Sequence, residues 1–212
     1  MRYVYLHGFA SSPDSSKGLA VAAHLAARRP SIHVERLNMR QPSFAHLRGS
    51  AMIAHVEARI GDEPTILLGS SLGGWVALRV AERNPNVQRL ILLAPAIGLA
   101  ANWKRRMPHD IEAWRRTGWR TVDDHAFGGT AEIDIGFLDD VDAIDAKGDP
   151  DVTVPTLIVH GRRDDVVPIA GSFRWAAERD NVRIVAVDDD HQLTTSLPTI
   201  LAEIDLALPP GA

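Results

Sequence analysis

The sequence predicts an α/β protein built around a doubly wound, mostly parallel sheet of six strands. Six short apolar segments of strand length alternate along the chain with segments of helical character. Strands that alternate with helices pair in parallel and carry helices on both faces of the sheet. At 212 residues, one domain buries about 70% of the surface that its unfolded chain exposes. We therefore expect a single domain over residues 1–212.

The expected elements follow from apolar runs and from the residues that bound them. Strands are expected at residues 2–6, 32–37, 65–69, 88–93, 154–160 and 182–187. Helices are expected at residues 16–29, 43–60, 72–84, 169–179 and 194–207. Pro30 should stop the first helix, because proline cannot continue one. The second helix should begin at Ser43, whose hydroxyl can cap its N-terminus, and end at Gly61.

The segment between Ala94 and Val154 breaks this alternation. It is far longer than an ordinary connection in an α/β unit, so it marks an insertion. The insertion holds Trp103, Trp114 and Trp119; its first part is rich in Lys and Arg, and its second part in Asp. Two interpretations stay open. The tryptophans line an acyl pocket while the basic part meets an anionic substrate, or the tryptophans form a small core while the two parts pair electrostatically.

The most informative motif is Gly-Ser-Ser-Leu-Gly at residues 69–73, between an expected strand and an expected helix. A serine flanked by glycines in a strand–turn–helix context is typical of a nucleophile elbow. A bare match could also be a tight turn or a phosphate-binding loop. The Lys-Ser/Thr pair that a P-loop requires is absent, because Gly74 and Trp75 occupy those positions. Ser71 is therefore the candidate nucleophile.

Two polar residues that suit a serine nucleophile follow later strands. Asp164 comes shortly after the strand at 154–160, and His191 comes shortly after the strand at 182–187. Open α/β sheets place their chemistry at the carboxyl ends of the strands, so these side chains are expected near Ser71. Serine needs a base, imidazole titrates near neutrality, and a carboxylate orients the imidazole. The order Ser, Asp, His predicts a catalytic triad.

These motifs resemble those of the α/β-hydrolase superfamily, in particular its short bacterial esterases and thioesterases. In such proteins a strand-end H-G-x-x-D-x-x-V-P segment carries the triad aspartate. The matching residues are His160, Gly161, Asp164, Val167 and Pro168. This register favours Asp164 as the triad acid and leaves its neighbour Asp165 as the alternative.

The resemblance extends to the N-terminal segment Tyr5–Phe9, which is similar to the family's H-G-F loop. It implies an oxyanion hole formed by the backbone N–H groups of Phe9 and Leu72. It also implies that residues 98–150 form a cap over the active site, and Trp103 and Trp114 are then the candidate substrate-binding residues if the cap's tryptophans line the pocket. Many members carry two additional N-terminal strands, which this sequence lacks. His7 and His160 are expected to orient loops around the site.

Taken together, the residues and the resemblance imply a serine hydrolase that cleaves carboxylic esters or thioesters through an acyl-enzyme, without a cofactor. The substrate would be a small molecule or an acylated partner. Three alternatives remain: a dedicated acyl-protein or acyl-CoA thioesterase, an amide or C–C bond hydrolase, and a ligand-binding protein with a silent triad. Turnover of a simple ester would separate the last from the others.

Composition narrows the remaining classes of function. A net charge of -4 argues against a nucleic-acid partner, and the absence of cysteine excludes disulfides and thiolate metal sites. Asp188–Asp190 precede His191, but without a second group of ligands we expect no metal. No apolar run approaches the ~18 residues of a membrane span. Because the first strand starts at residue 2, we expect no signal peptide and a cytoplasmic protein.

Overall fold

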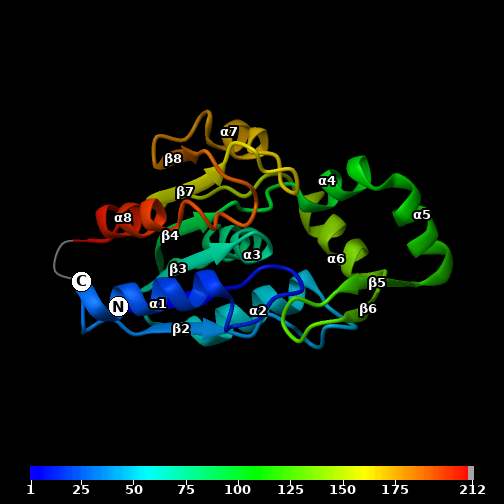
Figure 1. Ribbon diagram of the computed structural model, residues 1–212, viewed down its shortest axis with the longest axis horizontal. Helices are drawn as coiled ribbons and strands as arrows, with labels where there is room; N and C mark the ends of the chain where they lie inside the picture. The colour runs from blue at the N-terminus through cyan, green and yellow to red at the C-terminus, as the bar shows by residue number, and fades with distance from the viewer. Residues whose placement is uncertain (210–212) are drawn as a thin grey trace.

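A computed structural model describes residues 1–209, in which the predicted doubly wound sheet is confirmed (Figure 1). The six strands of the main sheet lie in the order β2-β1-β3-β4-β7-β8, and every neighbouring pair is parallel. In chain order the elements are β1 (Arg2–Leu6), α1 (Ser16–Arg28), β2 (Val34–Leu37), α2 (Gly49–Ile60), β3 (Thr65–Ser70), α3 (Leu72–Ala81), β4 (Val87–Leu93), α4 (Leu99–Arg106), α5 (Pro108–Thr117), β5 (Trp119–Asp123), β6 (Thr130–Asp134), α6 (Gly136–Asp145), β7 (Thr156–Gly161), α7 (Ala170–Ala176), β8 (Val182–Val187) and α8 (Leu197–Ala207).

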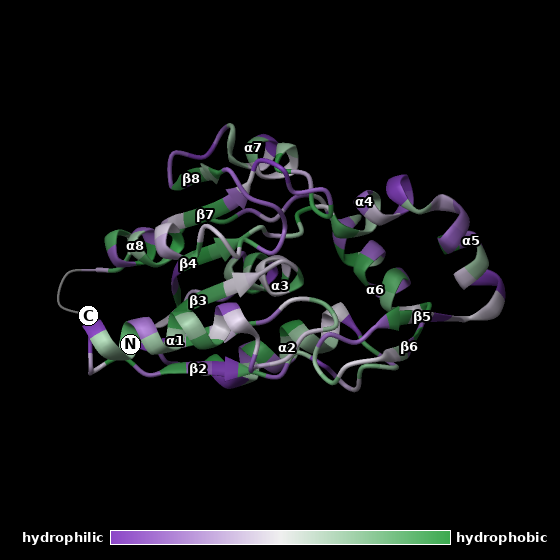
Figure 2. Ribbon diagram, in the orientation of Figure 1, coloured by the Kyte–Doolittle hydropathy of each residue, from purple (hydrophilic) through white to green (hydrophobic). Residues whose placement is uncertain are grey.

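Helices cover both faces of the sheet and divide its core in two. Val4 and Leu6 of β1 face a core shared with α2 and α3, whereas Tyr5 faces a second core shared with α1 and α8. This alternation is the period of two of a β-strand. Strands β3 and β7 are buried along their whole length, as parallel strands covered on both sides must be. Figure 2 shows the central strands β3, β4 and β7 as mostly apolar.

Several boundaries differ from the expected ones, most clearly at α2. The prediction that this helix begins at Ser43 is wrong, because it begins at Gly49. Ser43 Oγ instead accepts the backbone N–H of His46 in a local turn. The carbonyl of Ala45 accepts the N–H of Asp134 from β6, so pairing with the insertion holds this segment out of the helix. The predicted end at Gly61 is confirmed.

The insertion between β4 and β7 forms α4, α5, the antiparallel pair β5–β6, and α6. It lies at the end of the molecule toward which the parallel strands point (Figure 1). Lys104 pairs with Asp142 at 2.6 Å and Arg115 with Asp139 at 2.8 Å. These ion pairs join the basic and acidic parts, as the electrostatic interpretation predicted. Within residues 1–209 no helix is long and apolar enough to cross a lipid bilayer.

A buried ion pair fastens the insertion to the sheet domain. Arg79 of α3 is 4% exposed, and its guanidinium donates to Asp145 of α6 at 3.0 Å and to the carbonyl of Gly148 at 2.9 Å. The indole N–H of Trp75 donates to the same carboxylate oxygen at 2.8 Å. Asp145 therefore satisfies two buried donors of α3 at once.

We expect Asp145→Ala to lower the free energy of unfolding by about 3 kcal/mol. The buried Trp75 N–H loses its acceptor, and the buried Arg79 guanidinium keeps only the more distant carboxylate of Glu82, at 3.4 Å. Asp142→Ala on the same helix is the matched control. Its pair with Lys104 is 42% exposed on both sides, so the expected loss is at most about 1 kcal/mol. Urea denaturation of the two variants measures the difference. Equal losses would show that the Arg79 pair does not anchor the insertion.

Candidate active site

Ser71 occupies a strained turn between β3 and α3. Its φ of 53° and ψ of -114° lie in a region that residues other than glycine rarely adopt. The turn is tight because a β-carbon on Gly69 would collide with the carbonyl of Gly73. A β-carbon on Gly73 would collide in turn with the carbonyl of Leu6 in β1. The two glycines therefore allow the elbow, which presents the Ser71 hydroxyl at the carboxyl edge of the sheet.

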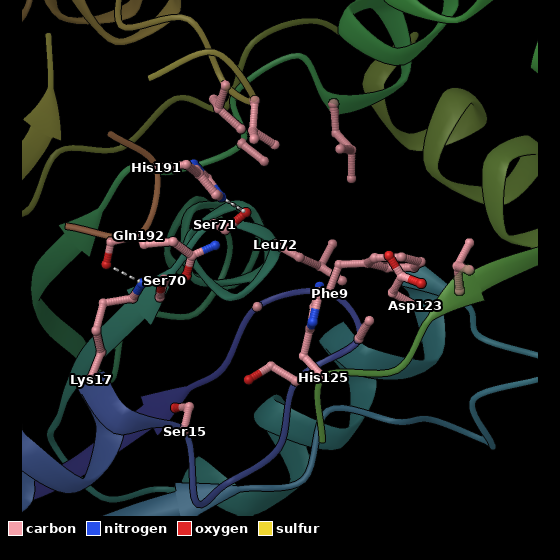
Figure 3. A pocket seen from close by; sticks show the side chains of 18 of the residues that line it. Phe9, Ser15, Lys17, Ser70, Ser71, Leu72, Asp123, His125, His191 and Gln192 are labelled. Carbon is pink, nitrogen blue, oxygen red and sulfur yellow. Dashed lines mark hydrogen bonds between the residues drawn. The ribbon is translucent and has the colours of Figure 1, made fainter. Parts of the chain in front are cut away.

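The structure brings Ser71, His191 and Asp164 into one chain of hydrogen bonds. The Ser71 hydroxyl lies 3.0 Å from His191 Nε2, and His191 Nδ1 lies 2.7 Å from Asp164 Oδ2. The first of these contacts is drawn in Figure 3. With an ionised carboxylate, Nδ1 carries the proton that it donates to Asp164. Nε2 is then free to accept the serine proton.

Asp164, rather than Asp165, faces the histidine. The Asp164 carboxylate is fully buried, and its Oδ1 accepts the N–H groups of Val166 at 2.9 Å and Val167 at 2.7 Å. Burial alone would raise the pKa of the Asp164 carboxyl, but hydrogen bonds from His160 and His191 outweigh it. They hold this pKa well below its usual range. Asp165 is exposed. Asp164 therefore stays ionised against His191.

A second histidine fixes the loop that carries Asp164. His160 is fully buried, and its Nε2 lies 2.8 Å from the carbonyl of Val167 and 3.2 Å from Asp164 Oδ2. Its Nδ1 lies 2.9 Å from the hydroxyl of Ser172 in α7. The carbonyl can only accept, so Nε2 carries the proton and Nδ1 accepts from the serine. This arrangement matches the loop-orienting role expected from the sequence.

The backbone N–H groups of Phe9 and Leu72 border the same site. In the part of the chain that the structure describes, neither donates to another protein group. Leu72 is the first residue of α3, where the helix leaves N–H groups unpaired and favours negative charge. Gly8 brings the neighbouring loop against the elbow, since a β-carbon on it would lie 3.5 Å from Ser71 Cβ. Both N–H groups are therefore available to a ligand beside Ser71.

His7 ties this loop to the segment that follows β2. Its Nδ1 lies 2.9 Å from the carbonyl of Gly8, and its Nε2 accepts the backbone N–H of Met39 at 3.0 Å. The side chain is 2% exposed, and burial lowers the pKa of the imidazole. The ring must be neutral to accept from Met39, so its protonation opposes the folded arrangement of the loop.

Because the folded-state pKa of His7 is depressed, the unfolded chain takes up the proton first. The stability that neutral His7 contributes is present above the unfolded pKa of about 6.5 and is lost as pH falls below it. We expect His7→Gln to be less stable than the wild type at pH 7.5 but to lose less stability on going to pH 5. Denaturant unfolding at both values measures this. His109→Gln, at an exposed position of α5, is the control, and an unchanged pH dependence in His7→Gln would contradict the assignment.

A pocket of about 570 Å³ opens beside Ser71, and its two ends differ in chemistry. One end is mainly aromatic, lined by Phe9 with Trp103 and Phe137 of the insertion, and Asp123 and His125 lie on the same side of Ser71 in Figure 3. The other end is polar and includes Lys17, whose side chain lies on the opposite side of Ser71 from Phe9 in Figure 3. Ser15, Ser70 and Gln192 lie on the same side in Figure 3, and Tyr5, Ser11 and Ser16 also line the pocket.

The two tryptophans expected to bind substrate have different positions. Trp103 lines the pocket and packs against Phe9, with ring centroids 5.4 Å apart, and against Phe137, at 5.7 Å. Trp114 is 1% exposed, and its indole N–H donates to the carbonyl of Ile133. The structure places Trp114 in the core of the insertion, behind Trp103, instead of on the pocket wall. Trp114 therefore does not line the pocket as expected, and its ring packs against that of Trp103, which does.

Sequence reasoning did not single out Lys17 or Phe137, which both line the pocket. Lys17 had a usable signal, because it closes the Ser-rich segment that follows the H-G-F loop. Phe137 had no such signal.

The acidic run before His191 has a structural role: Asp189 accepts the N–H groups of Asp190 and Ser196 and so shapes the loop that carries the histidine. Among the described residues, no group of three or more His, Asp and Glu side chains could hold a metal ion.

The fold and the geometry of this edge define a member of the α/β-hydrolase superfamily. The sequence also matches the model of one particular protein family. The model of UPF0227, described as an uncharacterised protein family, matches residues 2–207, and the chain belongs to this family.

Curated relatives include the mitochondrial palmitoyl-protein thioesterase ABHD10 of several mammals. The human protein is 29% identical over 135 residues, which are 62% of this chain and 42% of the relative. The mouse protein is 30% identical over 62% of this chain and 44% of its own length. The chain thus spans about half the length of the curated relatives that it matches.

Solved structures share the fold at lower identity. The alpha/beta hydrolase domain-containing protein 10 from mouse superposes with a TM-score of 0.78 at 21% identity, covering 96% of this chain and 87% of that chain. Est1E from Butyrivibrio proteoclasticus, with bound ferulic acid, superposes with a TM-score of 0.70 at 19% identity, covering 97% and 87%. These similarities show that the sheet and its flanking helices form an α/β-hydrolase fold.

Proposed function

We propose that this protein is a serine hydrolase that cleaves carboxylic esters or thioesters through a covalent acyl-enzyme. The observation that carries the proposal is the hydrogen-bonded chain from the Ser71 hydroxyl through His191 to the buried carboxylate of Asp164. It lies beside two N–H groups without protein acceptors and opens into a pocket. A nucleophile, a base, an orienting acid and oxyanion donors are together the parts that acyl transfer needs.

In the first half-reaction, Ser71 Oγ attacks the carbonyl carbon of the substrate while His191 Nε2 takes the serine proton. The carboxylate of Asp164 stabilises the imidazolium that forms. The N–H groups of Phe9 and Leu72 bind the oxyanion, and removing one such donor typically costs about 10²–10³-fold in rate. As the C–O or C–S bond breaks, His191 gives its proton to the departing oxygen or sulfur, and the acyl group stays on Ser71.

In the second half-reaction, water takes the place of the leaving group. His191 removes a proton from the water, whose oxygen attacks the acyl carbon. The bond to Ser71 Oγ then breaks, and the serine recovers its proton from His191. The products are a carboxylic acid and a free enzyme with its original protonation, so the cycle needs no cofactor.

The apolar end of the pocket suits the acyl portion of the substrate. Phe9, Trp103 and Phe137 form a continuous aromatic wall there, with centroid distances of 5.4–5.7 Å. Two of these side chains belong to the insertion, so we infer that residues 98–150 act as a cap that closes the acyl site. The alternative of a dedicated thioesterase draws support from the curated relatives, which are called palmitoyl-protein thioesterases. A ligand-binding protein with a silent triad is the other alternative.

The nucleophile can be tested directly. We expect Ser71→Ala to reduce turnover of p-nitrophenyl butanoate by about 10⁶-fold, the scale on which a triad serine contributes, without loss of stability. A fluorophosphonate probe should label Ser71 and leave Ser70 free, as peptide mass spectrometry would show. Labelling of Ser70 would overturn the assignment, and a wild type without turnover or labelling would favour a silent triad.

The adjacent residues Asp164 and Asp165 allow a matched test of which aspartate is the triad acid. Asp164→Asn should lower kcat by about 10⁴-fold, because the amide no longer enforces the correct tautomer of His191. Asp165→Asn makes the same chemical change at the adjacent exposed position and should leave kcat close to that of the wild type. The opposite ranking would identify Asp165 as the acid.

The acyl wall predicts a change in chain-length preference. Trp103→Ala enlarges the apolar end, so the kcat/KM of p-nitrophenyl esters should shift toward longer acyl chains, with discrimination between neighbouring lengths changing by about 1–3 kcal/mol. Trp119→Ala is the control, because Trp119 is 42% exposed and lies outside this pocket. A series from acetate to decanoate measures the preference. An unchanged profile in Trp103→Ala would place the acyl chain elsewhere.

A further inference from the structure

The polar end of the pocket contains an ammonium group that the proposed reaction does not use. Lys17 lies in the first turn of α1, and its Nζ donates to the backbone carbonyl of Gln192 at 2.8 Å. Within residues 1–209 it takes part in no ion pair with a carboxylate. An ammonium has three donor hydrogens, so two remain for a ligand. Figure 3 shows Lys17, Ser15 and Ser70 gathered on the same side of Ser71.

A buried hydroxyl without a partner lies at the same end. Tyr5 lines the pocket and is 1% exposed, and in the described structure its hydroxyl makes no hydrogen bond. A buried hydroxyl without a partner loses its hydrogen bonds to water and gains none from the protein, so a ligand acceptor would satisfy it. Burial raises the pKa of the phenol to about 12, against the opposite effect of the Ser15 and Ser70 hydroxyls beside it. Tyr5 therefore keeps its proton at neutral pH and, like Lys17, lines the pocket.

The position of this end relative to His191 indicates which part of the substrate it meets. His191 must give its proton to the leaving atom, so the leaving group departs on the His191 side of Ser71. Lys17 is bonded to Gln192, the residue directly after His191. The apolar wall around Phe9 lies on the other side of Ser71 (Figure 3). The acyl group and the leaving group thus meet opposite ends of the pocket.

Electrostatics select the kind of leaving group. Burial lowers the pKa of the Lys17 ammonium, whereas the nearby carboxylates of Asp190, Asp164 and Asp189 act in the opposite direction. Within residues 1–209 none of these carboxylates forms an ion pair with Lys17, so an anion at the free face of the ammonium would be its first direct counter-charge. The three neighbouring aspartates favour a singly charged carboxylate over a doubly charged phosphate, since repulsion grows with the charge of the ligand.

We propose that the enzyme prefers esters or thioesters whose leaving group carries a carboxylate, with Lys17 as the residue that determines this specificity and Tyr5 as a second donor. The proposal rests on the hydrolase function proposed above. It adds that one substrate spans the whole pocket, with an apolar acyl group against Phe9 and Trp103 and an anionic alcohol or thiol against Lys17.

Three esters of one chromophore test the proposal. The first is 3-(butanoyloxy)-4-nitrobenzoate, with a carboxylate on the leaving group; the second is neutral 2-nitrophenyl butanoate; the third is mono-(2-nitrophenyl) glutarate, with a carboxylate on the acyl group. The measure is the kcat/KM of each charged ester divided by that of the neutral ester. Comparing this ratio between wild type and variant cancels the intrinsic reactivities.

We expect Lys17→Met to lower the ratio for the first ester by about tenfold to a hundredfold, as loss of a charge-assisted hydrogen bond does. The ratio for the glutarate should stay within about twofold. Lys147→Met removes the same charge from an exposed lysine outside the pocket and should change neither ratio. A fall in both ratios, or in the glutarate ratio alone, would overturn the placement of the anion on the leaving group.

Tyr5→Phe separates a binding role from a structural one. Removal of an unsatisfied buried hydroxyl should leave the free energy of unfolding unchanged or raised. If Tyr5 binds the carboxylate, the ratio for the first ester should nevertheless fall. A lower stability together with an unchanged ratio would show that the hydroxyl serves the fold alone and would remove Tyr5 from the proposal.

A binding measurement keeps this proposal distinct from the proposed hydrolysis. Calorimetry with Ser71→Ala and the leaving group 3-hydroxy-4-nitrobenzoate should show binding that weakens at least about tenfold when Lys17→Met is added. If the wild type hydrolyses none of the three esters but this binding holds, the hydrolase proposal fails and the anion site stands. If all esters are hydrolysed with no effect of Lys17→Met on either measure, the anion site fails and the hydrolase proposal stands.

Discussion

The close passage of the β3–α3 turn beneath the end of β1 is the constraint on which the site depends. At Gly69 and Gly73 the backbone comes so near to its neighbours that a single methyl group would force the strands apart. The same approach holds Ser71 at a φ of 53° and places Leu72, the first residue of α3, at the wall of the pocket. It also brings Gly8 against Ser71, so the nucleophile and the two N–H groups beside it share one rigid arrangement.

Asp164 organises the other side of the site as a buried negative charge. Its two oxygens accept three hydrogen bonds, two from its own loop and one from His191, and His160 Nε2 lies 3.2 Å from Oδ2. Each bond stabilises the ionised form and together they outweigh the cost of burial. Its own loop, His160 of β7 and His191 of the loop after β8 all reach this one carboxylate, so the orientation of His191 depends on contacts far apart in the sequence.

The sheet could be predicted from the sequence because each strand carries its own apolar run and its own boundary. Ser71, Asp164 and His191 could be placed together for the same reason, since each follows a strand whose carboxyl end meets a common edge. The start of α2 could not be predicted from the sequence. The carbonyl of Ala45 accepts a hydrogen bond from the backbone N–H of Asp134, and such a long-range contact has no local signal. The separate positions of Trp103 and Trp114 were equally hidden, since both stand at helical positions in the insertion and only tertiary packing decides which one reaches the pocket.

Phe9 connects the proposed oxyanion site with the aromatic side chains of the insertion. Its backbone carries an N–H that we assign to the oxyanion, while its ring packs on Phe44, Trp103 and Phe137. A substrate that displaces the aromatic side chains of the insertion would therefore also move the residue whose N–H we assign to the oxyanion. Poorly fitting acyl groups would then be penalised in kcat as well as in KM, and selectivity for the acyl chain would be exercised during bond formation and not only during binding.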